Sequence, residues 1–404
     1  MAVDDPYQRF IGSMLASDDS MLASDDSMLA SDDGPDPELM SQQMLQALAW
    51  AAQGRQRSPW RGMLASTAAM LQRQDPRLQQ HCLGLTFPNP LGLAAGFDKN
   101  CVAAAIWHCF GFGFVELGTI TTRPYEGHPR PRLFHLAAEQ AILNHIGLCN
   151  NGSLQAATVL TEQQLPPPGQ RPALLGLNIG KSFQTPIEEA VEDYAVSYSH
   201  LAPLADYVVI NVSCPNDRNL YKLQGVEALR QLIGHLQATP LPTPRPPLLV
   251  KIAPDLTDGQ LLELGELALD LHRQGGLAGV IANNTSLDRQ GLETRRLVTG
   301  RTLAEEAGSL SGAPIRARSL AVVRRLWRQL QGRVPLIGVG GIDSPQTAWE
   351  RLTAGASLLQ LYTGWIYRGP QLVPAVLEGL LKQVEAHGLD TVADAVGTEL
   401  PWLP

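Results

Sequence analysis

From about residue 83 onward, two patterns of hydrophobic and polar positions alternate along this 404-residue chain. Short apolar runs, many rich in β-branched residues, predict strands, and stretches with apolar positions three or four residues apart predict helices between them. The predicted strands are residues 91–95, 113–118, 173–178, 206–211, 247–252, 278–283, 335–339 and 357–361. The clearest helical patterns are 187–203, 258–272, 314–329 and 370–386, and Thr257 with Gln260 forms a capping-box pattern.

Eight strands that alternate with helices indicate an α/β protein with a (β/α)8 TIM barrel. A doubly wound sheet is the alternative, but no Gly-x-Gly-x-x-Gly pattern follows the first strand to favour it. Polar residues or glycines follow all eight predicted strands. Because the chemistry of such barrels takes place at the carboxyl ends of the strands, we interpret these residues as one site.

The residues before the barrel pattern form two parts. Residues 13–33 are three identical copies of Ser-Met-Leu-Ala-Ser-Asp-Asp, and two aspartates in each copy disfavour a stable helix. An amphipathic helical pattern follows at 37–53, and after a linker a second short helix reaches about residue 71. We therefore expect a disordered or weakly helical acidic segment at 1–36, a small N-terminal helical extension at 37–80, the barrel at 81–390 and a tail at 391–404.

Composition narrows the class of protein without identifying it. The net charge of −8 comes from the first 40 residues, which contain ten acidic residues and one Arg, so the remainder is nearly neutral and does not resemble a nucleic-acid-binding surface. No apolar run approaches the ~18–20 residues of a transmembrane helix, and no secretory signal is expected. Five cysteines without a Cys-x-x-Cys pair indicate a reducing compartment, with neither a disulfide framework nor a metal site.

The run Asn211-Val212-Ser213-Cys214-Pro215-Asn216 directly follows a predicted buried strand. Asparagine both donates and accepts hydrogen bonds, so paired carboxamides can bind the alternating N–H and C=O groups of a planar cyclic amide. A thiol or hydroxyl between them is a candidate general base. An ordinary turn is the alternative, since Ser, Asn and Pro are common turn residues.

Glycine-rich turns follow the last two predicted strands, at Gly338-Val339-Gly340-Gly341 and Tyr362-Thr363-Gly364. Barrels commonly bind a phosphate through backbone N–H groups at this place, and Ser311-Gly312 could contribute. Each motif alone could be an ordinary turn. Together they imply a phosphorylated ligand.

Two lysines follow predicted strands at the same end of the barrel. Lys251 ends an apolar strand and needs an anion nearby, for which the N1–C2=O edge of a reduced flavin is one candidate. Lys99 follows Ala94-Ala95-Gly96-Phe97-Asp98, where small residues would let a flat ring lie against the backbone. The alternative for Lys99 is an exposed salt bridge with Asp98.

Seven segments, in chain order, resemble dihydroorotate dehydrogenases, most closely the membrane-associated, quinone-reducing class. The segments are Leu91 to Lys99, Glu116 to Thr119, Pro129 to Phe134, Asn178 to Lys181, Val250 to Leu256, Asn284 to Arg289 and Ile337 to Asp343. The resemblance covers about residues 80–385. It implies an FMN-containing barrel that oxidises dihydroorotate to orotate in pyrimidine biosynthesis and passes the electrons to a quinone at the cytoplasmic side of a cell membrane.

The resemblance also implies roles for individual residues. It assigns FMN binding to Ala94, Ala95, Gly96, Thr119, Asn178, Asn211, Lys251, Asn283, Ser311, Gly312, Gly341, Tyr362 and Thr363. It assigns binding of the pyrimidine to Lys99, Asn144, Asn211, Asn216, Asn284 and Thr285. Cys214 occupies the position of the base, which removes a proton from C5 while C6 passes a hydride to the flavin.

Several residues depart from the quinone-dependent class. That class has Ser at the position of Cys214, and Cys is the base of the soluble classes; a thiol, with a reference pKa of about 8.5, is the easier base. Residues 217–222 differ from the family's lid sequence, His135 replaces an Arg, Ser309 replaces a Gly, and acidic repeats stand where an apolar basic helix is expected.

These departures leave three alternatives. One is a soluble, cytoplasmic dihydroorotate dehydrogenase that uses Cys214 with fumarate or another acceptor. Another is an FMN- and orotate-binding barrel with impaired turnover. A phosphate-binding isomerase barrel without flavin would leave Lys251 and the asparagines unexplained.

Overall fold

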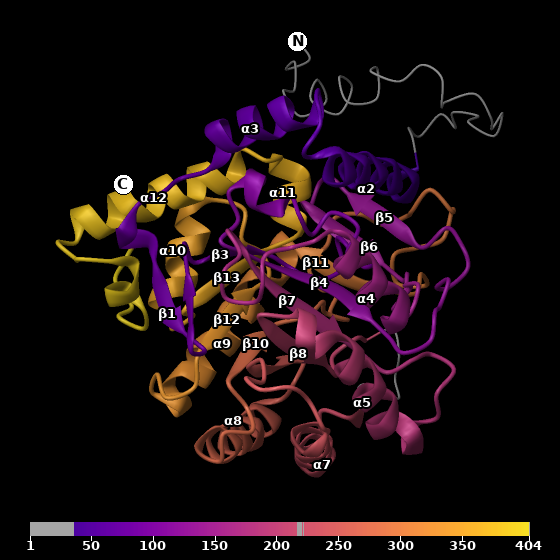
Figure 1. Ribbon diagram of the computed structural model, residues 1–404. Coiled ribbons are helices and arrows are strands. Elements are labelled where there is room, and N and C mark those ends of the chain that lie inside the picture. Colours follow the sequence, from indigo (N-terminus) through magenta and orange to yellow (C-terminus); the bar gives the residue numbers. More distant parts are fainter. Residues whose placement is uncertain (1–35, 216–219, 221, 404) are drawn as a thin grey trace.

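The computed structural model describes residues 36–215, 220 and 222–403, and these form a closed barrel of eight parallel strands surrounded by helices (Figure 1). Residues 1–35 of the expected acidic segment 1–36, with all of its repeats, lie outside the described residues, as do Asn216 and most of the expected lid. In spatial order the strands are β3 (Leu91–Leu93), β4 (Phe114–Ile120), β7 (Leu174–Ile179), β8 (Tyr207–Asn211), β9 (Leu248–Ile252), β10 (Gly279–Ala282), β12 (Leu336–Val339) and β13 (Leu358–Leu361). Pairing of Leu359 with Leu91 between β13 and β3 closes the barrel, so the predicted TIM barrel is confirmed.

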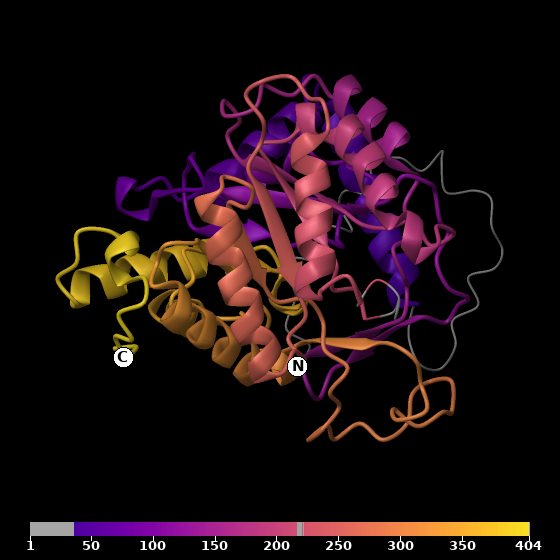
Figure 2. The same cartoon turned by 90° about the horizontal axis from the view of Figure 1, so that it is seen from below.

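Helices cover the outside of the barrel between successive strands, and Figure 2 shows α7 and α8 side by side. They are α4 (Ser153–Glu162), α5 (Ala190–Leu201), α7 (Val226–Ala238), α8 (Asp258–Arg273), α9 (Arg316–Leu330), α10 (Pro345–Thr353), α11 (Thr363–Arg368) and α12 (Leu372–Ala386). Short 3-10 helices lie at Pro76–Leu78, Trp107–Phe110, Ile187–Glu189, Ala202–Leu204, Ala313–Ile315 and Val392–Ala395. The predicted capping box is confirmed at the start of α8, where Thr257 and Gln260 bond each other's backbone N–H groups.

The inward-facing side chains change from apolar to polar along the barrel axis. Successive side chains of a strand point to opposite faces, so Phe114 and Glu116 of β4 both point inward, as do Leu249 and Lys251 of β9. At the amino ends, Phe114 packs edge-on against Phe87 with ring centroids 5.3 Å apart. Phe87 belongs to the hairpin of β1 (Gln80–Cys82) and β2 (Leu85–Phe87), whose apolar side chains fill that end of the barrel. The carboxyl end is left for polar groups.

The predicted N-terminal extension consists of two helices, α2 (Pro37–Gly54) and α3 (Trp60–Leu71). In Figure 1 they lie above the barrel, and α2 packs against β5 (Leu133–Leu136). β5 forms an antiparallel sheet with β6 (Ala141–Asn144) and β11 (Ser309–Gly312). None of the described helices is both long enough and apolar enough to cross a bilayer.

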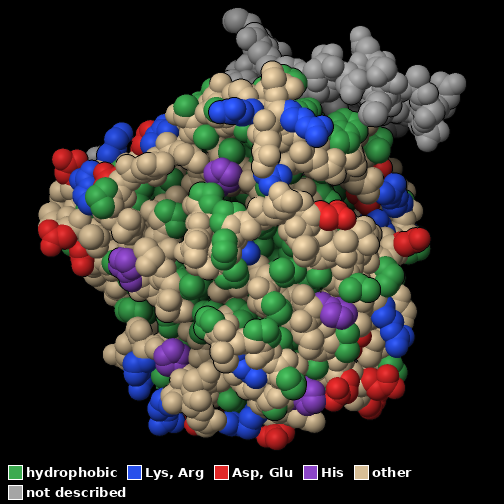
Figure 3. Space-filling model, in the orientation of Figure 1, with side chains coloured by type: hydrophobic (Ala, Val, Ile, Leu, Met, Phe, Trp, Pro, Cys, Tyr) green, Lys and Arg blue, Asp and Glu red, His purple; other side chains and the backbone are tan. Residues whose placement is uncertain are grey.

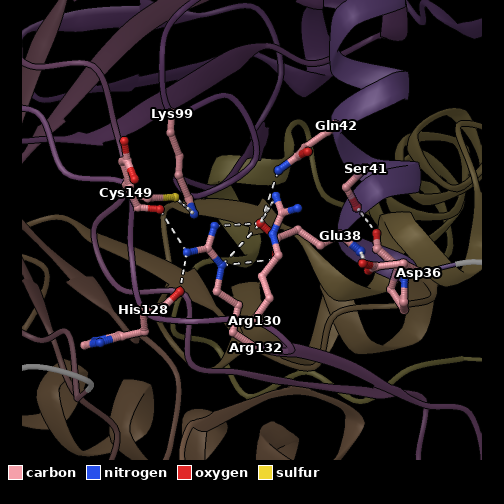
Figure 4. Close-up of polar contacts among 11 residues, drawn as sticks. Asp36, Glu38, Ser41, Gln42, Lys99, His128, Arg130, Arg132 and Cys149 are labelled. Atoms are coloured by element: carbon pink, nitrogen blue, oxygen red, sulfur yellow. Dashed lines mark hydrogen bonds and ion pairs between the residues drawn. The ribbon is translucent and has the colours of Figure 1, made fainter. Parts of the chain in front are cut away.

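A buried ion pair fastens α2 to the barrel domain (Figure 4). Glu38, in the first turn of α2, accepts hydrogen bonds from Nη2 of Arg132 at 2.7 Å and from Nε of Arg132 at 3.0 Å. Nη2 of Arg130 lies 3.2 Å from the same carboxylate. Burial alone would raise the pKa of Glu38, but the hydrogen bonds and charges of the two arginines outweigh it and lower that pKa below its ordinary value. This ion pair therefore links the first turn of α2 to the barrel domain, in addition to the apolar side chains that α2 buries in the core.

Candidate active site

A cleft that is partly open to solvent lies at the carboxyl end of the barrel. Residues on or after seven of the eight strands, all except β7, line it. Of the predicted site residues, Ala94, Ala95, Gly96, Lys99, Thr119, Asn144, Asn211, Cys214, Lys251, Asn283, Asn284, Thr285, Ser311, Gly312, Gly341, Tyr362 and Thr363 line the cleft. The predicted site is therefore one connected cavity in the described structure.

Two predicted residues are not among the cleft lining. Asn178, on β7, is completely buried, and its amide nitrogen donates to the carboxylate of Glu116 at 2.7 Å. Asn216 lies outside the described residues.

A buried carboxylate, Glu116, joins four strands beneath the cleft. It accepts hydrogen bonds from Asn178 on β7, from Lys251 on β9 at 3.1 Å and from Gln360 on β13 at 2.6 Å. Glu116 is fully buried, and the side chain of Lys251 is 5% exposed. Lys251 therefore has the anion that its position requires, and this anion is protein rather than ligand.

Amide groups on this polar layer have unsatisfied hydrogen-bonding atoms. Both side-chain polar atoms of Asn283 lack a partner, as do Oδ1 of Asn178 and Oε1 of Gln360. All are buried, and Asn283 and Gln360 line the cleft. Because an unsatisfied buried polar atom costs about 1–3 kcal/mol, their concentration at one surface indicates a place for a polar ligand.

The asparagines after β8 and β10 form a connected network. Asn211 donates to Oγ1 of Thr119 at 2.8 Å, and Oδ1 of Asn211 accepts from the hydroxyl of Ser213 at 3.0 Å. Asn284 in turn donates to Oγ of Ser213 at 3.0 Å. The hydroxyl of Ser213 is thus fully engaged and buried, whereas Cys214 lines the cleft. Of the two candidate bases predicted from the sequence, only Cys214 faces the cavity.

The opposite wall of the cleft is made of backbone and hydroxyl groups. Gly340 and Gly341 have φ angles of +104° and +70°, a region that favours glycine. Thr363 donates to Oγ of Ser311 at 2.7 Å. Ser309, which departs from the family pattern, accepts a hydrogen bond from Thr285 at 2.8 Å. This wall fits the predicted phosphate-binding turns.

Lys99 does not form the alternative salt bridge with Asp98. The Asp98 carboxylate is buried and accepts hydrogen bonds from the backbone N–H groups of Val102 and Ala103, both at 2.9 Å. Nζ of Lys99 instead lies 3.3 Å from Sγ of Cys149 (Figure 4), and Lys99 is one of the residues that line the cleft. Lys99 is therefore held toward the cavity.

His135, which replaces an expected Arg, lies on β5, with its ring centroid 5.8 Å from that of Tyr367. Its burial lowers the pKa of the imidazole below the ordinary value.

On the face shown in Figure 3, Lys and Arg side chains are dispersed among Asp and Glu rather than gathered into one patch.

Sequence reasoning missed Glu116 and Gln360 as site residues. Both leave a signal in the sequence, since each is a polar residue inside an apolar strand. Their partners could not be read from that signal, because Glu116 on β4 meets Lys251 on β9 and Gln360 on β13 across the barrel interior, from strands that are not its neighbours.

Comparison with known proteins identifies the family. A family model described as dihydroorotate dehydrogenase matches residues 77–384. The chain belongs to the dihydroorotate dehydrogenase family. Two curated relatives are both named dihydroorotate dehydrogenase (quinone). That from Prochlorococcus marinus (strain MIT 9313) is 57% identical over 400 residues, which are 98% of this chain and 96% of the relative. That from Nostoc punctiforme is 46% identical over 366 residues, 90% of this chain and 94% of the relative.

A solved structure supports the same assignment. The dihydroorotate dehydrogenase of Eimeria tenella, crystallised with ferulenol, is 34% identical with a TM-score of 0.77, and the match covers 91% of this chain and 97% of that chain. The predicted resemblance to quinone-dependent dihydroorotate dehydrogenases is therefore confirmed, as is the prediction of an enzyme that oxidises dihydroorotate. Dihydroorotate dehydrogenases are flavin-dependent enzymes.

Proposed function

We propose that this chain catalyses the FMN-dependent oxidation of dihydroorotate to orotate in pyrimidine biosynthesis and passes the electrons to a quinone. The observation that carries the proposal is the layer of unsatisfied amide atoms beside the Glu116–Lys251 ion pair, opposite a wall of glycines and hydroxyls. A polar, planar ring would bind at the layer of amide groups, and a phosphate attached to it would bind at the wall of glycines and hydroxyls. The name of the two relatives supports the choice of substrate and acceptor.

The residues present fit FMN. Asn283 and Gln360 offer unsatisfied donors and acceptors for the polar edge of the ring, with Thr119, Asn211 and Lys251 beside them. Asn178, which does not line the cleft, would act through its hydrogen bond to Glu116. Ala94, Ala95 and Gly96 have small side chains or none, so a flat ring could lie against their backbone. The space beside Gly96 is narrow, since a Cβ there would lie 3.2 Å from the Tyr362 ring. Ser311, Gly312, Gly341 and Thr363 would hold the phosphate. FMN supplies the acceptor for the hydrogen and electrons that leave C6 of the substrate.

The chain's own residues would then bind and orient dihydroorotate. Asn144, Asn211, Asn284, Thr285 and Asn216 would bind its cyclic amide groups, because carboxamides and the hydroxyl of Thr285 both donate and accept. Lys99 would bind its carboxylate, since an ammonium at the edge of a largely uncharged cleft favours an anion. The hydrogen bonds of Ser213 fix two of these asparagines in place.

Cys214 would remove the proton from C5. It lines the cleft, whereas the neighbouring Ser213 is bound within the asparagine network. A thiolate is a stronger nucleophile and a more accessible base near neutral pH than a serine hydroxyl. The deprotonated thiol takes up the proton, and the electron pair of the C5–H bond forms the new double bond to C6.

We also propose that α2 and α3 contact a membrane surface from its cytoplasmic side and deliver the quinone. Met40 of α2 and Met70 of α3 are 49% and 58% exposed, so each of the two helices presents a large apolar side chain to the surface. The ion pair of Glu38 with Arg132 would hold this element in position over the cleft domain.

Anaerobic mixing of the purified protein with dihydroorotate tests the proposal. We expect a bound flavin identified as FMN by mass, prompt loss of its absorbance on mixing, and reoxidation by a ubiquinone analogue in preference to fumarate. A Cys214→Ala variant should retain the flavin but not bleach. Absence of flavin would refute the cofactor, and preference for fumarate would refute the acceptor. Bound flavin without bleaching in the parent would favour a barrel with impaired turnover.

A further inference from the structure

One buried cation lies directly behind the glycine turn of the cleft wall. Arg351, on α10, is 1% exposed. Its side chain packs closely against β12, because a Cβ added to Gly338 would lie only 2.5 Å from Cγ of Arg351. Nη2 of Arg351 donates to the carbonyl of Gly340 at 2.6 Å. The turn is thus held from behind by a guanidinium.

The charge of Arg351 has no counter-ion in the described part of the chain. Its Nε and Nη1 atoms are buried without a hydrogen-bond partner. Burial lowers the pKa of this guanidinium to about 9. The adjacent Glu350 carboxylate binds Gln346 instead, at 2.9 Å. Since an unpaired buried charge is costly, the position of Arg351 calls for an anion close by.

Arg316 makes a useful contrast on the same turn. Its Nε donates to the carbonyl of Gly341 at 2.9 Å, but its charge is matched by Asp343, whose carboxylate lies 2.6 Å from Nη2. Both arginines fix a carbonyl of the turn. Only Arg351 adds uncompensated positive charge.

The cleft side of the turn, by comparison, has hydroxyls and glycines but no charge. The charged residues among those that line the cleft are Lys99 and Lys251. Lys251 is paired with Glu116 and Lys99 contacts Cys149. A phosphate dianion on this wall would therefore find hydrogen-bond donors, whereas the two lysines of the cleft already contact Glu116 and Cys149.

We propose that Arg351 is a positioning residue for the phosphate group of the flavin, which it stabilises through the glycine turn without touching it. It holds the Gly340 carbonyl toward α10 and away from the cleft, and its charge offsets that of the phosphate across a thin layer of buried backbone. Electrostatic interactions of this kind are strong because water does not screen them. This inference rests on the proposed function.

Riboflavin, which lacks the phosphate, separates this role from a structural one. Flavin-free protein is prepared from the holoenzyme, and the affinities for FMN and for riboflavin are measured by fluorescence quenching. For Arg351→Met we expect the affinity for FMN to fall by roughly ten- to a hundredfold, and that for riboflavin to change by less than about threefold. Arg351→Lys should retain most of the preference for FMN. Arg324→Gln, which removes an exposed arginine of α9, should leave both affinities unchanged.

The affinities for FMN and riboflavin distinguish a role toward the phosphate from a purely structural role of Arg351. Equal losses for FMN and riboflavin in Arg351→Met, or an unchanged FMN affinity, would overturn the inference. If the Met variant does not fold, Arg351→Gln, which keeps a neutral donor toward Gly340, is expected to give the same selective loss. A parent protein that binds neither flavin would refute the proposed function itself.

Discussion

Replacement of Glu116 by Gln removes one negative charge from the centre of the barrel and keeps the shape of the side chain. Glu116 accepts hydrogen bonds from Lys251, Asn178 and Gln360 and is completely buried. In the variant, the ammonium group of Lys251 would remain in the interior without a counter-ion. We therefore expect a large loss of stability from a substitution that creates no cavity.

The size of the loss follows from the burial of the pair. Removal of one partner of a buried ion pair costs about 3–5 kcal/mol, because the remaining charge is uncompensated. For a chain of 404 residues, the entropy of unfolding is ~0.8 kcal/mol per degree. The melting temperature should therefore fall by about 4–6 °C.

Circular dichroism of flavin-free protein at one fixed scan rate measures this shift without the contribution of a bound ligand. Glu263→Gln, an exposed glutamate of α8, is the matched control and should melt with the parent. Addition of Lys251→Met to Glu116→Gln should recover part of the loss, because the unpaired charge is then gone. A shift below ~1 °C, or strictly additive effects of the two substitutions, would refute the reasoning.

Three further predictions concern the base, the substrate lysine and the N-terminal helix. Cys214→Ala should slow flavin reduction by dihydroorotate about 10²–10⁴-fold in stopped-flow measurements, with flavin binding intact. In Cys214→Ser, the rate of flavin reduction should begin to rise only at a pH above about 8.5, the range in which a thiol ionises. Because Lys99 lies 3.3 Å from Sγ of Cys149, Cys149→Val should raise KM for dihydroorotate by roughly three- to tenfold and change kcat little; an unchanged KM would contradict the role of Lys99. Glu38→Gln should lower the melting temperature at neutral pH, where the parent carboxylate is charged and paired with Arg132. The ion pair lowers the pKa of Glu38 below its ordinary value of 4.5, so the parent loses this stabilisation only as the pH falls below 4.5 and the carboxylate is protonated. The difference in melting temperature between parent and variant should therefore vanish there. A difference that persists below that carboxylate's pKa would contradict the electrostatic explanation.

The order of strands and helices could be predicted because each parallel strand reads as a separate apolar run between polar loops. The observed bounds of β4, Phe114–Ile120, differ from the predicted 113–118 by one or two residues. Motif residues such as Asn211 and Gly341 were also predictable, since short segments next to strand ends carry them to the same end of the barrel. Local sequence is sufficient for features of this kind.

Contacts between distant segments were not predictable in the same way. The sequence places Asp98 next to Lys99 and suggests a salt bridge, but the Asp98 carboxylate binds backbone N–H groups of the following turn. Cys149, 50 residues away, contacts Lys99 instead. Glu116 likewise meets Lys251 and Gln360, on strands that are not neighbours of β4, only when the barrel closes. Such pairings depend on tertiary geometry, to which a single sequence gives no direct access.

The geometry after β8 explains how this chain can differ from its class at the base without disturbing the rest of the site. Asn211, the last residue of β8, and Ser213, two residues later, belong to the same network, where Ser213 accepts from Asn284 and donates to Asn211. Cys214 contributes to the cleft wall and takes part in neither of these two bonds. A change between serine and cysteine at position 214 therefore alters the acidity of the base, whereas the same change at position 213 would break the bonds that orient both asparagines. We infer that the identity of the base and the positioning of the pyrimidine are separable in this enzyme, so the cysteine alone is no argument against quinone as the acceptor.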